Sequence, residues 1–160
     1  MVEHDSEVPA EGKQVITACA FIHQEFDGVE KLFLPKRAET KKFLPGVFEL
    51  PGGHIDFGED IVVGLKREVM EEFGMNISVG DPFSAFTYIN NIKGSHSVEV
   101  VYFSEFTDPI ENIKINLEDH SEYKWVSESE VPEDGSVSPE ELKNIKKGFA
   151  LLRGENILKN

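Results

Sequence analysis

Four glutamates and one arginine occur at fixed distances in a short stretch that begins and ends near glycines. Residues 53–75 contain, in order, Gly53, Glu59, Arg67, Glu68, Glu71, Glu72 and Gly74. On a helix, Glu68 and Glu72 would lie one turn apart, where like charges repel unless something intervenes. A hard divalent cation removes that repulsion, and carboxylate oxygens suit Mg²⁺ or Mn²⁺. An isolated acidic run usually faces water, but the spacing of the whole stretch favours metal ligation.

These acids need an element that positions them, and the sequence predicts a helix from about residue 60 to residue 73. Gly58 precedes this segment, and Gly74 is a suitable C-terminal stop. At 3.6 residues per turn, one stripe of the helix is apolar and should pack on a sheet. The stripe consists of Ile61, Val62, Leu65, Val69 and Phe73. The glutamates therefore fall on an adjoining face.

The same stretch resembles the Nudix box, which runs Gly, five residues, Glu, seven residues, Arg-Glu, aliphatic, any residue, Glu-Glu, any residue, Gly, aliphatic. Every defined position is matched, by Gly53, Glu59, Arg67, Glu68, Val69, Glu71, Glu72, Gly74 and Met75. At average residue usage, such a match arises by chance with a probability on the order of 10⁻⁷. Segments 32–37, 48–53 and 122–126 also resemble strands of this family. The chain thus resembles a MutT-like Nudix hydrolase over about residues 14–152.

The resemblance implies chemistry as well as a fold. A member of this family would cleave a nucleoside diphosphate linked to another group, with Mg²⁺ or Mn²⁺ as the cofactor. Glu68, Glu71 and Glu72 would be metal ligands. Gly52 and Gly53 would shape the substrate-binding loop, and the carbonyl of Gly53 would be a further ligand.

We expect two arginines, Arg67 and Arg37, to have different roles. We expect Arg67 to pair with Glu59 or Glu71 and to orient acids, in a supporting role, rather than to contact the substrate. Arg37 ends an apolar strand, and two interpretations stand equal: it grips a terminal phosphate with its planar fork, or it lies in a surface turn. For its neighbour Lys36 the surface turn is favoured.

The general base is either a glutamate of the box or an acid from a distant loop. The loop before Trp125 contains Glu118 and Asp119, and either is a candidate base or additional ligand. His120 follows them, and a histidine in such a loop is expected to be exposed and to take no part in the reaction.

Length and charge limit the remaining interpretations. A chain of 160 residues is expected to form one domain at 14–160, with a flexible tail at 1–13. The formal charge of −14 repels anions, so a nucleotide should bind only with a metal ion.

We expect a small nucleotide as the partner, with no nucleic-acid polymer and no membrane; homodimerisation is left open. Cys19 lies in an apolar strand and should be a buried, inert thiol, and the cytoplasm is the default location.

The order of elements predicts an α/β/α sandwich with a mixed β-sheet. Strands are expected at 15–23, 30–34, 48–50, 77–79, 83–89, 98–106 and 123–126. A hairpin turn is expected at 90–94. Ser138, Pro139 and Glu141 form the pattern of a capping box, which predicts a second helix reaching about Leu152.

The box specifies a reaction and leaves the substrate open. Marks of several subfamilies are missing, which leaves a (deoxy)nucleoside triphosphate, cleaved to monophosphate and pyrophosphate, as the leading substrate. A nucleotide sugar comes second. A non-catalytic nucleotide-binding module is the alternative class, but all the acids of the box are present. An isoprenoid diphosphate isomerase would need a catalytic cysteine, and only Cys19 is available.

Overall fold

A computed structural model describes residues 9–156 of the chain, and its centre is a mixed β-sheet. The strands are β1 (Gln14–Phe26), β2 (Val29–Arg37), β3 (Gly52–His54), β4 (Ile77–Asn90), β5 (Ser95–Phe106) and β6 (His120–Val126). Their order is β4-β5-β1-β2-β6, with β3 paired to β1. Strands β1 and β5 run parallel, and the other pairs are antiparallel.

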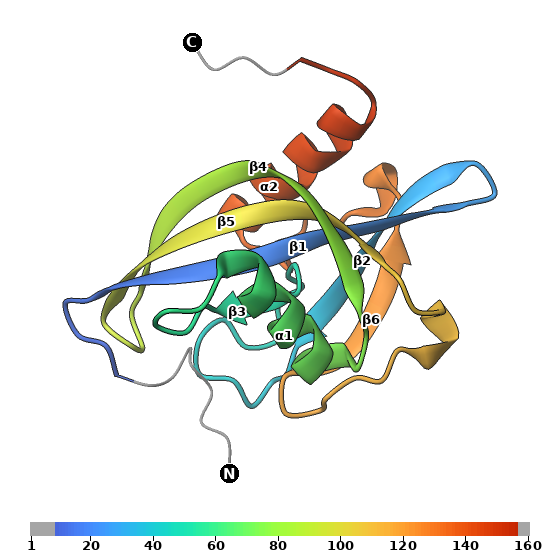
Figure 1. Ribbon diagram of the computed structural model, residues 1–160. Coiled ribbons are helices and arrows are strands. Elements are labelled where there is room, and N and C mark those ends of the chain that lie inside the picture. Colours follow the sequence, from blue (N-terminus) through green and yellow to red (C-terminus); the bar gives the residue numbers. More distant parts are fainter. Residues whose placement is uncertain (1–8, 157–160) are drawn as a thin grey trace.

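Two helices cover opposite faces of this sheet: α1 (Ile61–Phe73) and α2 (Pro139–Leu152) (Figure 1). Short 3-10 turns lie at η2 (Ile110–Asn112) and η3 (Glu128–Glu130). Side chains of a strand alternate between its faces, so β1 serves both layers. Ala20 and Ile22 pack with Leu65 and Val69 of α1, whereas Phe21 packs with Phe149 of α2. The expected α/β/α sandwich with a mixed sheet is confirmed.

Some boundaries differ from the expectations. The predicted strands 77–79 and 83–89 form one strand, β4, with irregular pairing around Pro82. Because β4 is an edge strand, a proline costs it no central ladder bond. The strand predicted at 48–50 is wrong: Phe48 makes only isolated bridges to Lys36 and Val137, and the short strand β3 lies further along, at 52–54.

The predicted hairpin turn at 90–94 is present and joins β4 to β5. A second tight hairpin joins β1 to β2 through Asp27 and Gly28, with φ of 50° and 82°. Within residues 9–156, no helix combines the length and apolar character that crossing a membrane requires. Most of the predicted tail, residues 1–8, lies outside the described part of the chain.

Candidate active site

Helix α1 holds the acidic stretch in place through its caps and its buried stripe. The Asp60 side chain accepts hydrogen bonds from the backbone N–H groups of Val62 and Val63, at 3.0 and 3.2 Å. Gly74 ends the helix in the left-handed conformation, with φ 65°. The predicted stripe is buried most fully at Leu65, Val69 and Phe73. This anchoring leaves the glutamate face turned toward the loop and β3.

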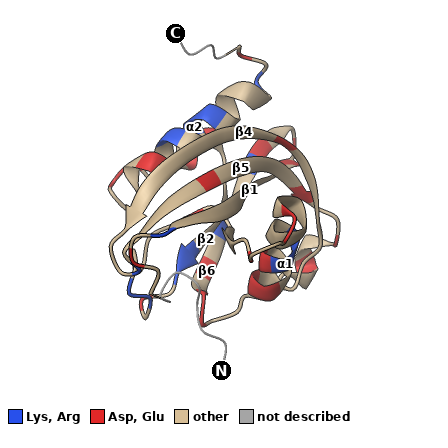
Figure 2. Ribbon diagram, turned by 60° about the vertical axis from the view of Figure 1, so that its left-hand side comes forward, with Lys and Arg blue, Asp and Glu red and all other residues tan. Residues whose placement is uncertain are grey.

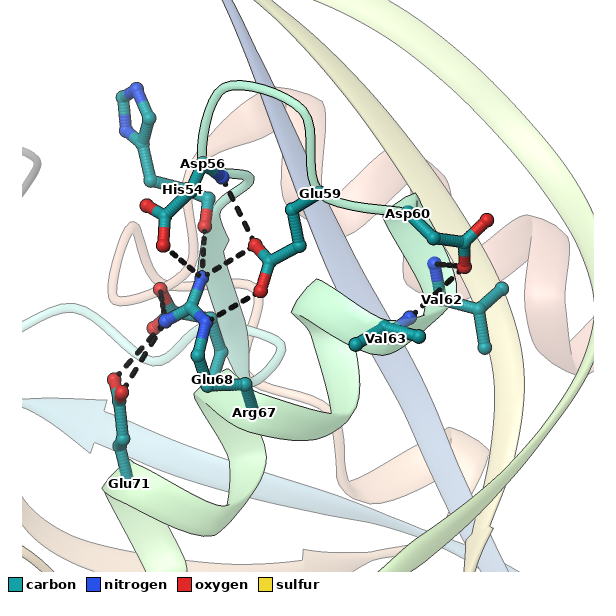
Figure 3. A network of polar contacts seen from close by, with 9 residues as sticks. All are labelled: His54, Asp56, Glu59, Asp60, Val62, Val63, Arg67, Glu68 and Glu71. Carbon is teal, nitrogen blue, oxygen red and sulfur yellow. Dashed lines mark hydrogen bonds and ion pairs between the residues drawn. The ribbon is translucent and has the colours of Figure 1, made fainter.

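Arg67 is the centre of a network that joins this helix to the preceding loop (Figure 3). Its Nε donates to Glu59 Oε2 at 2.8 Å, and its Nη2 donates to the carbonyl of His54 at 2.9 Å. Its Nη1 lies 3.1 Å from Glu68 Oε1 and 3.3 Å from Glu71 Oε2. Arg67 therefore contacts both of its expected partners. The pKa of Glu59 is lowered to about 2, mainly by the hydrogen bond from Arg67.

The two glycines before the box bring the backbone against the acids. Gly52 has φ 148°, and a Cβ there would lie 2.1 Å from the carbonyl oxygen of Ala18. Its N–H donates to Glu72 Oε1 at 3.1 Å. A Cβ at Gly53 would lie 2.6 Å from Glu68 Oε2. Any larger residue would push the loop away from β1 or displace Glu68.

A cavity of about 540 Å³ opens beside these groups, a size suited to a small-molecule ligand. Of the predicted site residues, it is lined by Arg37, Gly52, Gly53, Arg67, Glu68, Glu71, Glu72, Glu118 and Asp119. Glu59 does not line the cavity and instead holds Arg67. The structure thus brings together segments that lie up to 82 residues apart in the sequence, from Arg37 to Asp119.

The donor set fits a hard divalent cation. Glu72 is 7% exposed, and burial followed by the charges of Glu49, Glu68 and Asp119 raises its pKa well above the ordinary value. Such crowding of carboxylates is unfavourable until a cation joins them. Glu68, Glu71 and Glu72 offer oxygen ligands of the kind that Mg²⁺ and Mn²⁺ prefer. Glu71, whose side chain is 55% exposed, lies on the open side of the group.

The expected exposure of His120 is wrong. It lies at the start of β6, is completely buried, and stacks on Phe73 with ring centroids 5.0 Å apart. Its Nε2 is 2.9 Å from Glu49 Oε2, and its Nδ1 is 3.6 Å from Glu72 Oε2. The ring therefore lies between two acids. It is buried because His120 pairs with Arg37 of β2.

The surface-turn interpretation is also wrong for Arg37, whose side chain is only 11% exposed. Its Nε donates to the carbonyl of Phe43 at 3.0 Å, and its Nη1 lies 3.3 Å from Glu49 Oε1. Its buried Nη2 has no hydrogen-bond partner among the described residues. Lys36 instead lies over the ring of Phe48, at 5.8 Å from the centroid, and is not part of the cavity wall.

Four acids of the cavity wall were not predicted from the sequence: Glu49, Asp56, Glu99 and Glu141. Ser138 caps α2 as predicted, accepting a hydrogen bond from the N–H of Glu141 at 3.3 Å. The carboxylate of Glu141, however, binds the backbone of Leu50 rather than completing the capping box. Glu99 occurs among valines on the buried side of β5, and an acid at such a position is a signal of function.

Charge is unevenly divided around the cavity. Figure 2 shows acidic and basic segments side by side on α1, whereas α2 is acidic at its start and basic along much of its length. Acidic side chains outnumber lysines and arginines in the cavity wall. Lys41 is 7% exposed and donates to Asp119 at 3.1 Å, which fixes one candidate base of the predicted loop beside the box.

Comparison with known proteins agrees with this geometry. The family model described as the NUDIX domain matches residues 13–147. The chain therefore belongs to the NUDIX family, and the resemblance of its box is confirmed.

Individual relatives match over parts of their length or at low identity. The m7GpppN-mRNA hydrolase NUDT17 of Danio rerio is 39% identical over 49 residues, which are 31% of this chain and 16% of that protein. The MutT protein from Methanosarcina mazei Go1 superposes with a TM-score of 0.73 at 23% identity, covering 91% of this chain and 99% of that chain. A C. elegans Ap4A hydrolase gives a TM-score of 0.72 at 21% identity, covering 88% and 99%. The two structural matches establish a shared fold.

Proposed function

We propose that this protein is a divalent-metal-dependent pyrophosphohydrolase that cleaves the phosphoric anhydride of a nucleoside diphosphate derivative. The leading substrate is a (deoxy)nucleoside triphosphate, with monophosphate and pyrophosphate as products. The observation that carries the proposal is the convergence of Glu68, Glu71 and Glu72 on one cavity beside Gly52 and Gly53. A binding module would not need an intact set of crowded, mutually repelling acids.

Different residues of the cavity would bind the metal ion and transfer the proton. Glu68, Glu71 and Glu72, with the carbonyl of Gly53, would hold Mg²⁺ or Mn²⁺. The ion, when bound, supplies charge neutralisation for the phosphate oxygens and activates water. Glu118 or Asp119, both in the cavity wall, would accept the proton of the attacking water.

Arg37 has the position and the chemistry of a phosphate contact. Arg37 lines a cavity in which acids outnumber basic residues, and its buried Nη2 has no hydrogen-bond partner within residues 9–156. A guanidinium forms strong paired hydrogen bonds with phosphate oxygens. Meanwhile Arg67, with its nitrogens directed at Glu59, Glu68 and Glu71, would keep the acids oriented.

The test is a panel of nucleoside triphosphates, dinucleotides and sugar nucleotides incubated with the protein and Mg²⁺. Chromatography should show a nucleoside monophosphate as a product. A relative named for an mRNA cap and a neighbour named for Ap4A make dinucleotides a necessary part of the panel. Cleavage confined to sugar nucleotides would favour the second substrate class, and tight binding with no turnover would favour the non-catalytic module.

Glu72→Gln is the matched variant for the chemistry. Loss of one charged ligand should lower kcat/KM at least about 100-fold, because a bound ion contributes several kcal/mol to the transition state. The fold should persist, since the variant relieves a buried charge, and circular dichroism and Tm check this. Glu105→Gln, an exposed acid of β5, is the control. Full activity of Glu72→Gln would remove its assignment as a ligand.

A further inference from the structure

A second group of polar side chains lies in the same cavity, apart from the acids of the box. Glu99 of β5, Glu141 of α2 and the thiol of Cys19 of β1 approach one another, with ligand-type atoms of all three within 4.8 Å. Glu49 is close to both groups, since its charge raises the pKa of Glu72 and also that of Glu99. The cavity therefore continues from the box to a separate polar end.

The described part of the protein supplies hydrogen-bond partners for only some of the polar atoms at this end. Glu99 Oε1 accepts from the hydroxyl of Thr17 at 3.1 Å, and Oε2 accepts from the Cys19 thiol at 3.6 Å. Glu141 accepts from the backbone of Leu50. Its Oε1, however, is buried and has no hydrogen-bond partner in the described part of the chain. A buried acceptor without a donor is costly and rare in native proteins, so a donor from a ligand is expected here.

The ionisation of the group suits a neutral ligand that donates hydrogen bonds. Burial raises the pKa of Glu99 to about 7, and burial and the charge of Glu99 raise the pKa of Glu141 well above its ordinary value. Two such carboxyls near each other are not ionised together, so the pair offers acceptor oxygens and a hydroxyl donor. Burial also raises the pKa of Cys19, which keeps the thiol protonated and makes it a poor metal ligand.

The walls beside this group are aromatic. Phe43 and Tyr88 both line the cavity, and their rings are stacked with centroids 6.0 Å apart and planes 11° from parallel. Burial raises the pKa of the Tyr88 hydroxyl, which hydrogen-bonds with Ser97 and Thr17 and is thus held in place. Flat aromatic walls next to directional polar groups are the usual environment of a heterocyclic ring.

We propose that Glu99 and Glu141 form the base-reading end of the cavity and select a nucleobase that carries adjacent N–H donors, of which guanine is the standard example. Guanine presents N1–H and an exocyclic N2–H₂ side by side, with the O6 acceptor next to them. A carboxylate accepts the two donors together, as acidic side chains do when they read base edges, and the carboxyl that is protonated can donate to O6. Adenine, cytosine and uracil lack two adjacent donors on this edge. The proposal rests on the proposed function, because it names the base of that substrate.

Nucleosides test this proposal apart from hydrolysis, because they have no anhydride to cleave and need no metal ion. Binding of guanosine, inosine, 1-methylguanosine and adenosine to the full chain is measured by NMR titration of backbone amides. Guanosine should bind at least about tenfold more tightly than inosine, which lacks N2–H₂, and than 1-methylguanosine, which lacks N1–H. The amides of Cys19, Leu50 and Glu99 should shift. This comparison uses only the unaltered protein, so it does not depend on any variant folding.

Two variants locate the recognition. Glu99→Gln and Glu141→Gln should each reduce the preference for guanosine over inosine at least about fivefold. Their matched controls are Glu105→Gln on the same strand and Glu140→Gln in the same helical turn; both residues are exposed, and both variants should keep the preference.

Several results would overturn the proposal. These are equal binding of guanosine, inosine and 1-methylguanosine, no shifts at the named amides, or an unchanged preference in both glutamine variants. Stoichiometric binding of Zn²⁺ that Cys19→Ala abolishes would make the group a metal site and would overturn it as well. If guanosine binds selectively but no nucleotide in the panel is cleaved, the proposed hydrolysis fails and the base-reading assignment stands. If nucleotides of all bases are cleaved at equal rates and no nucleoside binds selectively, the hydrolysis stands and the base-reading assignment fails.

Discussion

A glutamate buried beside other glutamates costs free energy unless a cation or a hydrogen-bond donor reaches it. The cavity contains this arrangement twice, at Glu72 and at Glu141. Burial is the main cause of the raised pKa at both residues, and neighbouring acids add to it. Glu49 differs: burial alone would raise its pKa, but Arg37 and His120 lower it. The cavity thus contains two kinds of acid. Arg37 and His120 lower the pKa of Glu49, whereas the pKa values of Glu72 and Glu141 stay raised.

His120 provides a test at the scale of one residue. His120→Phe keeps the stacking on Phe73 but removes the nitrogens that lie near Glu49 and Glu72. We expect the apparent affinity for Mg²⁺ and kcat/KM to fall about 10- to 100-fold, as happens when partners of metal ligands are lost. Metal-dependent activity curves measure the effect.

His96→Phe is the control for this substitution, since the ring of His96 pairs with Gln14 away from the cavity. A variant of His120 with a lowered Tm but unaltered apparent Mg²⁺ affinity would show that the ring serves stability alone.

The acids of the box were predictable because their spacing is local, whereas Glu49, Glu99 and Glu141 reach the cavity through tertiary structure. Glu49 lies between apolar residues in the sequence, yet nothing local shows that Arg37 and His120 hold it. The error at His120 has the same origin. Burial of a loop residue depends on which strand the loop folds against, and local composition does not contain that information.

At the scale of elements, the loop before α1 depends on one arginine. Arg67 binds Glu59, the carbonyl of His54 and two acids of its own helix, so the loop and the helix form one unit. Helix α1 itself was predictable within one residue, because its cap at Asp60 and its stop at Gly74 are both local signals.

Glu59→Gln tests this unit through pH. The folded-state pKa of Glu59 is about 2, against 4.5 for the free side chain. Its contribution to stability is therefore present above pH 4.5 and is lost as pH falls from 4.5 toward 2. The shift sets an upper limit of about 3 kcal/mol, and solvent screening reduces it. We expect a loss of about 1–2 kcal/mol in the free energy of unfolding at pH 7, measured by urea denaturation.

The difference between Glu59→Gln and the natural protein should shrink by about half or more at pH 3. Glu105→Gln should show neither the loss nor its pH dependence. A constant difference between pH 7 and pH 3 would mean that packing, and not the charge of Glu59, is responsible.

Other element boundaries depended on which strands pair with each other, and the local sequence does not show these pairings. Two strands were predicted, at 77–79 and 83–89, but they are one strand, because an edge strand tolerates a proline and β4, which contains Pro82, is at the edge. The short strand near the box was displaced by a few residues because Gly52 and Gly53 can approach β1 closely where bulkier residues cannot.

At the scale of the whole molecule, the alternation of apolar residues and the order of elements were enough to predict two layers of helix around one sheet. Each face has its own core, one around Phe21 and Phe149 and one around Phe33 and Phe73. What the sequence could not supply was the pairing of β1 with β5, which carries Glu99 beside Thr17. Pairings between distant strands depend on the whole fold.

The net charge of −14 yields a prediction for the whole molecule. Unassisted, this field repels a nucleoside triphosphate, so its affinity should fall at least about 100-fold when Mg²⁺ is replaced by excess chelator. Isothermal calorimetry of a triphosphate, with and without chelator, measures this. A neutral nucleoside is the control and should bind equally in both conditions. Tight binding of the triphosphate in chelator would contradict the prediction.

Strand β1 contacts both ends of the cavity. The backbone of Cys19 faces Gly52, whose amide holds Glu72, while the Cys19 thiol touches Glu99. The distance between the proposed base-reading end and the acids of the box is consequently set by the register of a single strand. If both proposals hold, mutations at Glu99 or Glu141 should alter which nucleotide is accepted without moving the point at which its phosphate chain is cut.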